Sequence, residues 1–513
     1  MQSSIQDAAG GHIQEVTVEI QDDTEWIKKV TNDINECREK TQGRWKCSIF
    51  KVPEDIRQCN MKAYDPLVVT IGPYHYNKSE DRTVLAMQAH KWHCVRRLLS
   101  RHTKSRRKAT DLLGKCLMEM QRKDADVRGC YSEDLHHLSA NDLALIMLLD
   151  GCFVIHVLLR HNKEKHHCCD MITLDENEDD ADDGGQQQEE EEEEEEEEDN
   201  NIVTGHKDMV VLDVMGKKQI DLRVSAFRVW TMMLFDLVKV ENQIPFIMIQ
   251  TLFNELKTPR DKNINLVKIA HDLLKPIHPA SHYKNSVSDQ PLPQSNDVHH
   301  LLHLFHSTIV PSAECLKINS MEQEMDYEWI PSATELQLAG VEFVSKKGNT
   351  HSFLDISFKN GTIEIPQISL YDDTETLFRN LIAFEQCYPN AKYYLTGYVF
   401  FMDYMINTTK DVELFELKGI LINYLGTADA ATTLINQLCH NIYDPGNNYL
   451  LGSILQVQNH YKSRWHKWRA RLMRDYFDNP WAIVSLVAAL ILLLLTVQQS
   501  FFTAYAYFRP PKN

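Results

Sequence analysis

The chain has 513 residues, of which 43% are apolar, enough for one large domain or for two to three ordinary ones. Its 54 basic residues face 73 acidic residues, but eighteen of these acids lie between Asp175 and Asp199. Without that tract, 55 acids face 54 bases, so the rest of the chain is nearly neutral. No basic domain remains that would predict nucleic-acid binding.

The N-terminal region, residues 1–44, is polar and is predicted to be a flexible segment without a secretory signal peptide. It has neither the basic start nor the apolar stretch that such a signal needs. The twelve cysteines of the chain form no CxxC set. We therefore expect reduced thiols in place of a disulfide framework.

A helical body is predicted to begin at residue 45, and its first part covers residues 45–170. Its strongest apolar run is SANDLALIMLLDGCFVIHVLLRH, where Ser139 followed by Asp142 is typical of a helix start. The run is long enough to cross a membrane. However, Asp150 lies in its middle, and a central carboxylate costs about 2.5–3.5 kcal/mol on membrane insertion. We therefore predict a buried core helix.

The acidic tract is predicted to be a disordered polyacidic insertion over residues 171–205. Ten consecutive glutamates repel one another and bury no apolar surface. Loop-closure entropy grows only logarithmically with length, so the insertion has little effect on stability. The tract either binds a basic partner, binds Ca²⁺ weakly, or only keeps the surface soluble. Without ordered geometry it makes no EF-hand-like site.

The remainder of the body, residues 206–475, is predicted to be helical around one short β section. An apolar helical run is expected to be kinked or interrupted at Pro245, and a polar linker is expected over residues 281–297. In the section 341–366, the pair Asn360-Gly361 between alternating apolar residues predicts a type I′ hairpin. The predicted fold class is mainly α (α+β), a large helical body with a small antiparallel β-hairpin section.

The C-terminal region predicts a single transmembrane helix over residues 480–504, followed by a short tail, residues 505–513. From Trp481 to Phe508 there are 28 residues without a formal charge. At about 1.5 Å per residue they exceed the roughly 30 Å of a bilayer core. The basic residues that precede the span outnumber the two that follow it, and they are Lys462, Arg464, Lys467, Arg469, Arg471 and Arg474. The positive-inside rule then places the body in the cytosol.

The sequence contains none of the usual catalytic or cofactor motifs, such as a P-loop, HExxH or GxSxG. We therefore predict no catalytic, cofactor-binding or metal site and identify no small-molecule substrate. Two clusters have residue types that bind zinc. They are His299, His300, His303 and His306, and then His161, His166, His167, Cys168 and Cys169. The first is more typical of a core stripe and the second of a polar helix end.

Two carboxylates, Asp150 and Glu241, lie inside apolar runs. A buried carboxylate can have a raised pKa and serve as a general acid or base. It can equally cap a helix or pair with an arginine. Because no nucleophile or oxyanion donor lies near either of them in the sequence, we interpret both as structural. An enzyme would require the two carboxylates to converge on one cleft.

Several blocks of the sequence, taken together, resemble a known family. They are VPEDIRQCNMKAYDPLVVTIGPYHY (52–76), MLLDGCFVIHVLL (147–159), VENQIPF (240–246), IPSATELQLAGVEF (330–343), LDISFKNGTIEIPQISLYDDTETLFRNLIAFEQCYP (354–389), FMDYMINTTKDVELF (401–415) and RWHKWRARLMRDYFDNPWAIVSLVAALILLLLTVQ (464–498). The chain resembles, from Ile49 to Tyr507, the plant-specific "domain of unknown function 247" family of uncharacterised membrane proteins.

The resemblance implies a mostly helical soluble body, one C-terminal membrane span, and no known enzymatic activity or cofactor. One branch of this family in grasses is similar to pollen-side determinants of self-incompatibility, which are thought to act through protein–protein recognition at the cell surface. The acidic tract lies where that branch carries acidic insertions.

We therefore expect a non-enzymatic protein of recognition or signalling, anchored in the lipid bilayer of the plasma membrane, with unknown protein partners. Recognition at the cell surface requires the body outside, whereas the basic flank and the missing signal peptide favour the cytosol. The alternatives are an undetected enzyme with an Asp150/Glu241 pocket and a constitutive structural membrane anchor.

Overall fold

A computed structural model describes most of the chain after residue 46. The described residues are 28–30, 47–76, 82–103, 105–173, 225–279, 292–319, 330–346, 352–444, 446, 448–462 and 480–508. The chain divides into two units, Met1–Cys47 and Ser48–Asn513. The predictions for most of residues 1–44, for the acidic tract from Asp175 onward and for most of the linker lie outside the described residues.

The centre of the second unit is helix α6 (Ala140–Thr173), which begins at the predicted start. The Ser139 hydroxyl donates to the Asp142 carboxylate at 2.7 Å, and the Asp142 backbone N–H donates back to Ser139 Oγ at 3.1 Å. Within Ala140–Lys163, 89% of the apolar window is buried inside the body. The prediction of a core helix is therefore confirmed, and the helix extends three residues into the predicted insertion.

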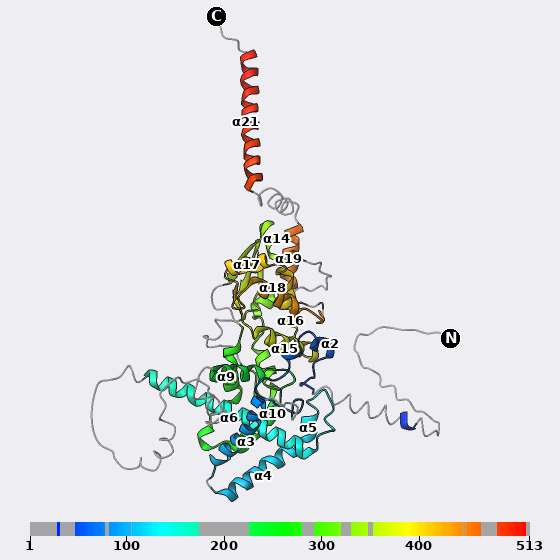
Figure 1. Ribbon diagram of the computed structural model, residues 1–513, viewed down its shortest axis with the longest axis vertical. Helices are drawn as coiled ribbons and strands as arrows, with labels where there is room; N and C mark the ends of the chain where they lie inside the picture. Colours follow the sequence, from blue (N-terminus) through cyan, green and yellow to red (C-terminus); the bar gives the residue numbers. More distant parts are fainter. Residues whose placement is uncertain are drawn as a thin grey trace, which may run out of the picture. The chain divides into compact units, whose positions relative to one another are not determined.

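Four helices pack around α6, and Figure 1 shows α3, α4 and α10 gathered beside it. They are α3 (Arg82–Ser100), α4 (Arg106–Arg122), α10 (Phe246–Leu256) and α11 (Leu266–Leu274). The shorter elements that precede the first strand are α2 (Glu54–Arg57), η2 (Met61–Ala63), α5 (Asp124–Arg128), α9 (Ser225–Asp236), η4 (Pro259–Asp261), η5 (Lys275–Ile277), η6 (Ser295–Asp297), α12 (Leu301–Ser307), α13 (Ala313–Asn319) and α14 (Ala333–Leu338), of which α13 and α14 pack on elements of the C-terminal half.

The interruption predicted at Pro245 is confirmed, but it is wider than one residue, because nine irregular residues separate α9 from α10. Side chains beside and within this segment bind the backbone of another loop. The Asp236 carboxylate accepts from the backbone N–H of Val68 and Val69, at 2.6 and 3.0 Å. Asn242 accepts from the N–H of Ile71 at 2.6 Å. The buried polar groups of the break therefore fix the loop before Gly72.

The predicted hairpin is present, with β2 (Ser357–Lys359) antiparallel to β3 (Thr362–Pro366). Its turn residues Asn360 and Gly361 have φ angles of 52° and 83°, as a type I′ turn requires. The sheet is mixed, because β1 (Glu342–Lys346) pairs in parallel with β3. Within the predicted β section, residues 352–356 lie outside any strand. A second small sheet pairs β4 (Ile368–Leu370) in parallel with β5 (Leu421–Asn423).

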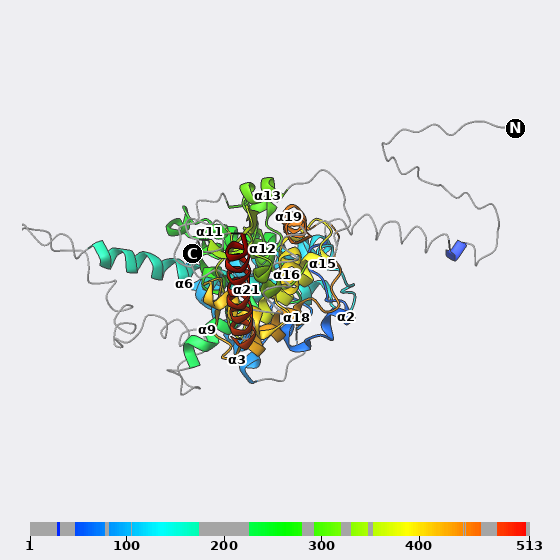
Figure 2. The ribbon, with the colours of Figure 1, turned by 90° about the horizontal axis from the view of Figure 1, so that it is seen from above.

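Helices α15 (Thr374–Cys387), α16 (Tyr394–Met405) and α18 (Ala428–Leu438) pack against one another in the C-terminal half of the body, and Figure 2 shows them on one side. They are accompanied by α17 (Thr409–Leu417) and α19 (Leu451–Lys462). No disulfide joins the nine cysteines whose side chains the structure describes, which are Cys47, Cys59, Cys94, Cys116, Cys130, Cys152, Cys315, Cys387 and Cys439.

The segment 48–76 connects the two halves of the body. The Ser48 carbonyl accepts from the His300 ring at 2.8 Å. Asn60 donates to Glu375 on α15 at 3.0 Å, and the Asp55 carbonyl accepts from the Asn441 side chain at 2.9 Å. An early segment of the chain is therefore held by residues from its middle and its end.

The last element is helix α21 (Pro480–Phe508), which starts where the span was predicted to start and continues four residues beyond the predicted end. Its apolar stretch Val484–Tyr505 is long and apolar enough to cross a membrane, and none of it is buried in the body. Of the basic residues used for the orientation, only Lys462 lies within the described residues.

Candidate functional site

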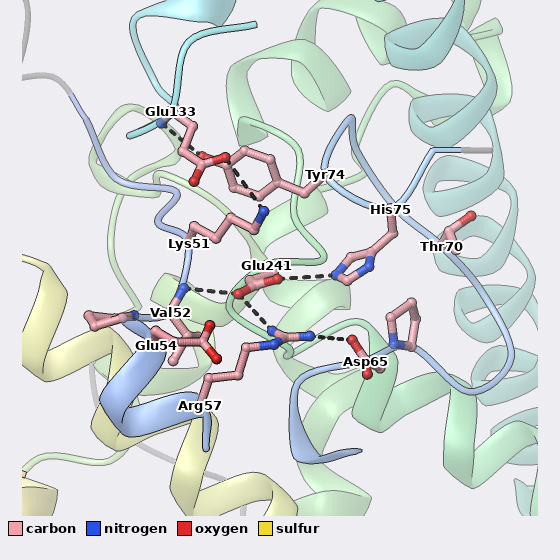
Figure 3. Close-up of a pocket in the computed structure, with 12 residues that line it drawn as sticks. Lys51, Val52, Glu54, Arg57, Asp65, Thr70, Tyr74, His75, Glu133 and Glu241 are labelled. Atoms are coloured by element: carbon pink, nitrogen blue, oxygen red, sulfur yellow. Dashed lines mark hydrogen bonds and ion pairs between the residues drawn. The ribbon is translucent and has the colours of Figure 1, made fainter. Parts of the chain in front are cut away.

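A polar cavity of about 740 Å³ opens between the segment 51–75 and the irregular stretch before α10. Figure 3 shows Arg57, His75 and the backbone of Val52 converging on Glu241, with Asp65 on the far side of Arg57. The lining residues are Lys51, Val52, Pro53, Glu54, Arg57, Asp65, Pro66, Thr70, Tyr74, His75, Glu133 and Glu241. Two blocks of the family resemblance, 52–76 and 240–246, therefore supply nearly all of this site.

Glu241 lies at the inner end of the cavity and is buried. Its Oε1 accepts from the backbone N–H of Val52 at 2.9 Å and from the Arg57 guanidinium at 2.9 Å. Its Oε2 lies 3.6 Å from His75 Nε2. Burial raises the pKa of the Glu241 carboxyl, and the Val52 N–H and the Arg57 charge oppose that rise. The carboxylate thus joins the loop that precedes α2 to the stretch before α10.

Arg57 projects from α2 and contacts two carboxylates at once, because its other amino group lies 2.5 Å from Asp65. Its guanidinium also lies over the Tyr64 ring, 5.8 Å from the ring centroid. The Arg57 side chain is mostly buried, whereas half of the Asp65 side chain is exposed. Arg57 is therefore held by one buried carboxylate and one carboxylate at the rim.

The opposite rim is formed by Lys51, Tyr74 and Glu133. Lys51 Nζ lies 3.6 Å from the Glu133 carboxylate and over the Tyr74 ring. The Tyr74 hydroxyl accepts from the backbone N–H of Glu133 at 3.2 Å. Lys51 and Glu133 are both substantially exposed, so this pair contributes little to stability and is free to exchange partners.

The electrostatic balance of the cavity is negative. Four carboxylates face two cations and one histidine, and the carboxylates are Glu54, Asp65, Glu133 and Glu241. The Glu54 carboxylate is exposed and accepts only an amide hydrogen bond, from Gln58 at 3.3 Å. A cavity with this balance favours a positively charged group over an anion.

The structure does not place Asp150 in this cavity. Asp150 lies inside α6, where Lys91 Nζ is 2.5 Å from its carboxylate and the backbone N–H of Gly72 donates to it at 2.7 Å. Burial raises the pKa of the Asp150 carboxyl, and Lys91 opposes that rise. Lys91 also donates to the Thr70 carbonyl. Asp150 accepts from Gly72 and Glu241 accepts from Val52, so both carboxylates hold the segment 48–76. Of the two, only Glu241 lines the cavity.

The histidine cluster at α12 is hydrogen-bonded through its rings. His299 contacts the Tyr388 hydroxyl at 2.8 Å, His300 the Ser48 carbonyl at 2.8 Å, and His306 the Glu385 carboxylate at 2.9 Å. His303 Nδ1 accepts from the His299 backbone N–H. Burial, followed by the neighbouring His299, lowers the pKa of His303 to about 3.

Helix α12 begins at Leu301, so His300 caps it and His299 lies outside it. Of the second cluster, His161 lies in the described part of α6. The side chains of His166, His167, Cys168 and Cys169 lie outside the described residues.

Sequence reasoning identified Glu241 but missed the other cavity residues. Lys51, Arg57, Asp65, His75 and Glu133 are ordinary charged residues in turns and loops. No spacing rule connects Arg57 to Glu241, since 184 residues separate them. The available signal was indirect, because the block 52–76 has a high density of charged, aromatic and proline residues between apolar ones.

The fold and the cavity define a class of protein: a mainly helical body with a small mixed sheet, a charged cavity, and an apolar C-terminal helix. No solved structure shows significant similarity to the chain. The model of the DUF247 family, described as a plant protein of unknown function, matches residues 49–495. The chain therefore belongs to the DUF247 family.

Two relatives from Arabidopsis thaliana extend this finding. The UPF0481 protein At3g47200 is 25% identical over 494 residues, which cover 92% of this chain and 90% of the relative. The putative UPF0481 protein At3g02645 is 22% identical over 574 residues, covering 95% and 96% of the two chains. The family match, residues 49–495, covers the body and the first part of α21.

Proposed function

We propose that this protein is a non-enzymatic, membrane-anchored recognition or signalling protein. The observation that carries the proposal is α21, whose apolar side chains are exposed on every face while the body has a core of its own. Eleven Ile, Val or Leu residues between Ala482 and Val497 favour insertion by roughly 3–7 kcal/mol. The helix serves as a single-pass anchor, with the plasma membrane as the membrane concerned.

The cavity is the recognition site of this proposal. Its excess of carboxylates selects a basic group, and its rim residues Lys51, Asp65 and Glu133 are exposed enough to exchange partners. The occupant is a lysine or arginine side chain of a partner protein, which pairs with Glu54 and Glu133. A cationic side chain placed between carboxylates gains from bidentate, charge-assisted hydrogen bonds.

A binding role is favoured over catalysis by the state of the groups in the cavity. Glu241 is the carboxylate of this cavity that is buried and has a raised pKa. Its Oε1 accepts hydrogen bonds from two donors, however, so it holds the backbone of Val52 and the side chain of Arg57 in place. Among the described residues that line the cavity there is no serine or cysteine to act as nucleophile. Asp150, the second carboxylate of the enzyme alternative, lies outside the lining.

Within this proposal, the role is that of a pollen-side self-incompatibility determinant. The support is the resemblance to that branch of the family and the position of the acidic tract between α6 and α9. The basic residues before α21 favour a cytosolic body, from which the protein signals. A constitutive structural anchor shares α21 but has no use for a charged, open cavity.

Protease protection tests the anchor. The full chain with an N-terminal tag is inserted into sealed vesicles of known sidedness, and a variant lacking residues 480–508 serves as control. We expect the full chain to stay in the membrane after alkaline extraction and its tag to be digested from the cytosolic side. Release of the full chain by alkali would contradict the anchor, and a tag protected on that side would contradict the cytosolic orientation.

Site-specific photocrosslinking in the native membrane tests recognition. A photoreactive residue replaces Lys51 at the rim of the cavity, which leaves Glu54 and Glu133 in place, or, as a matched control, the exposed Met118 on α4. We expect a discrete protein adduct from position 51 that is absent from position 118 and is lost when Asp65→Lys and Glu133→Lys reverse the charge of the rim. An adduct that persists after charge reversal would exclude the cavity as the recognition site.

A further inference from the structure

A second cluster, separate from the cavity, lies between α3 and α6. His90 and Cys94 lie one turn apart on α3, and His156 lies on α6. One ligand atom from each of the three residues lies within 4.8 Å of the other two. All three side chains are buried, Cys94 completely. We propose that His90, Cys94 and His156 bind a zinc ion that links α3 to the core helix.

The spacing on α3 explains how two ligands meet. Residues four apart lie on the same face of a helix, so His90 and Cys94 both face α6. α6 supplies the third ligand from the opposite side, and the rings of His90 and His156 meet edge to face with their centroids 6.4 Å apart. Two rigid helices thus hold three donors in fixed positions, which is the condition for a preorganised metal site.

The donor set indicates the metal. Imidazole nitrogen and thiolate sulfur are the ligands of zinc, whereas calcium and magnesium require oxygen. Zinc binds these atoms at about 2.0–2.3 Å, so tetrahedral ligands lie roughly 3.3–3.8 Å from one another. The present limit of 4.8 Å requires only a small closure of the side chains. Three protein ligands leave one tetrahedral position for a further ligand.

α3 and α6 are also joined by an ion pair, because Lys91, the neighbour of His90 in the sequence, lies 2.5 Å from Asp150 on α6. On binding, Cys94 loses its thiol proton to solvent and the two histidines bind as neutral imidazoles, so one proton is released for each ion bound.

Cobalt substitution tests the site in the full chain purified in detergent and stripped of metal by a chelator. Co²⁺ bound by a thiolate in a tetrahedral site shows intense visible bands and a sulfur-to-metal charge-transfer band in the near ultraviolet. We expect these bands to saturate at one ion per chain, to disappear when Zn²⁺ is added, and to be absent in Cys94→Ser. We expect His156→Gln to weaken binding by at least about tenfold.

Two controls make the test specific. Cys116→Ser removes another fully buried thiol, on α4, which is not among the three ligands, and it should leave the bands intact. The double variant Cys168→Ser/Cys169→Ser removes the thiols before the acidic tract and should also leave them intact. Bands that survive in Cys94→Ser but vanish in the double variant would overturn the proposal, as would the absence of any band in the unmodified protein.

X-ray absorption at the zinc edge gives a readout that needs no variant. The unmodified chain loaded with Zn²⁺ should show one sulfur neighbour at about 2.3 Å and two imidazole nitrogens at about 2.0–2.1 Å. A shell of oxygen atoms alone would show that the ion lies on exposed carboxylates, and it would overturn the proposal even if Cys94→Ser failed to fold.

Discussion

Helices α6 and α21 have the same mean hydropathy over their apolar windows and similar lengths, yet their surroundings are opposite. The window of α6 is 89% buried inside the body, and that of α21 is not buried at all. The difference lies in a few polar residues. Asp150 and His156 of α6 are buried beside partners that only a folded protein supplies, whereas α21 has no charged residue between Trp481 and Phe508. Apolar content alone therefore does not distinguish a core helix from a membrane helix.

The largest effect is expected at the ion pair that distinguishes α6. Lys91→Met leaves the buried Asp150 carboxyl without its cation, so that at neutral pH it must either stay charged or take up a proton, and it should lower the free energy of unfolding by about 3–5 kcal/mol. Urea unfolding of the full chain in detergent, followed by circular dichroism, measures the loss. The double variant Lys91→Met/Asp150→Leu should recover most of it. Equal losses in both variants would mean that packing, and not the charge pair, matters at this site.

The same variant has a pH signature. Burial already raises the pKa of Asp150, and removal of Lys91 raises it further because Lys91 opposes that rise. The folded Lys91→Met protein then holds a proton that the unfolded chain, with a pKa of about 3.9, has lost. Its stability should therefore fall as the pH rises from about 4 through the folded-state pKa. A pH-independent deficit relative to the unmodified protein would contradict this account.

A matched truncation in each helix compares the two surroundings directly. Leu148→Ala in α6 removes a fully buried side chain and should cost the body about 2–5 kcal/mol. Leu493→Ala in α21 removes an exposed one and should leave the unfolding of the body unchanged. Both variants are measured by urea unfolding in detergent. A comparable loss from Leu493→Ala would show that α21 packs on the body.

A charge in the middle of α21 tests its role in the membrane. Leu492→Arg should disfavour insertion by about 2.5–3.5 kcal/mol without unfolding the body. The fraction of chains that resists alkaline extraction measures insertion, and Leu492→Ala is the control for the loss of the leucine itself. Full retention of the arginine variant would mean that α21 is not held by a bilayer.

The smallest effect is expected at the start of α6. Ser139→Ala removes the hydroxyl that accepts from the Asp142 backbone N–H and should cost about 1 kcal/mol. Ser139→Asp, which keeps an acceptor there, should cost less, although it places a second carboxylate beside Asp142. The midpoints of urea unfolding compare the two variants. An alanine variant as stable as the unmodified protein would show that the cap is dispensable once the helix is packed.

Local signals predicted much of the fold. The Asn360-Gly361 turn, the Ser139–Asp142 helix start and the two long apolar helices follow from the chemistry of neighbouring residues. The parallel pairing of β1 with β3 could not be predicted, because it depends on how distant segments meet. The cavity and the proposed zinc ligands could not be predicted from the sequence for the same reason. His90 and Cys94 have a recognisable spacing, but His156 joins them only through the packing of α3 on α6.

The hydrogen bonds of the segment 48–76 have a consequence for how the protein folds. Asp55 binds Asn441, which follows it by 386 residues, and Asn60 binds Glu375. Contacts between positions so distant in the chain raise the contact order and slow folding. During synthesis, the segment 48–76 cannot complete these contacts until Glu375 and Asn441 have left the ribosome. Chaperones that hold nascent chains are therefore expected to bind this segment until the last third of the body has emerged.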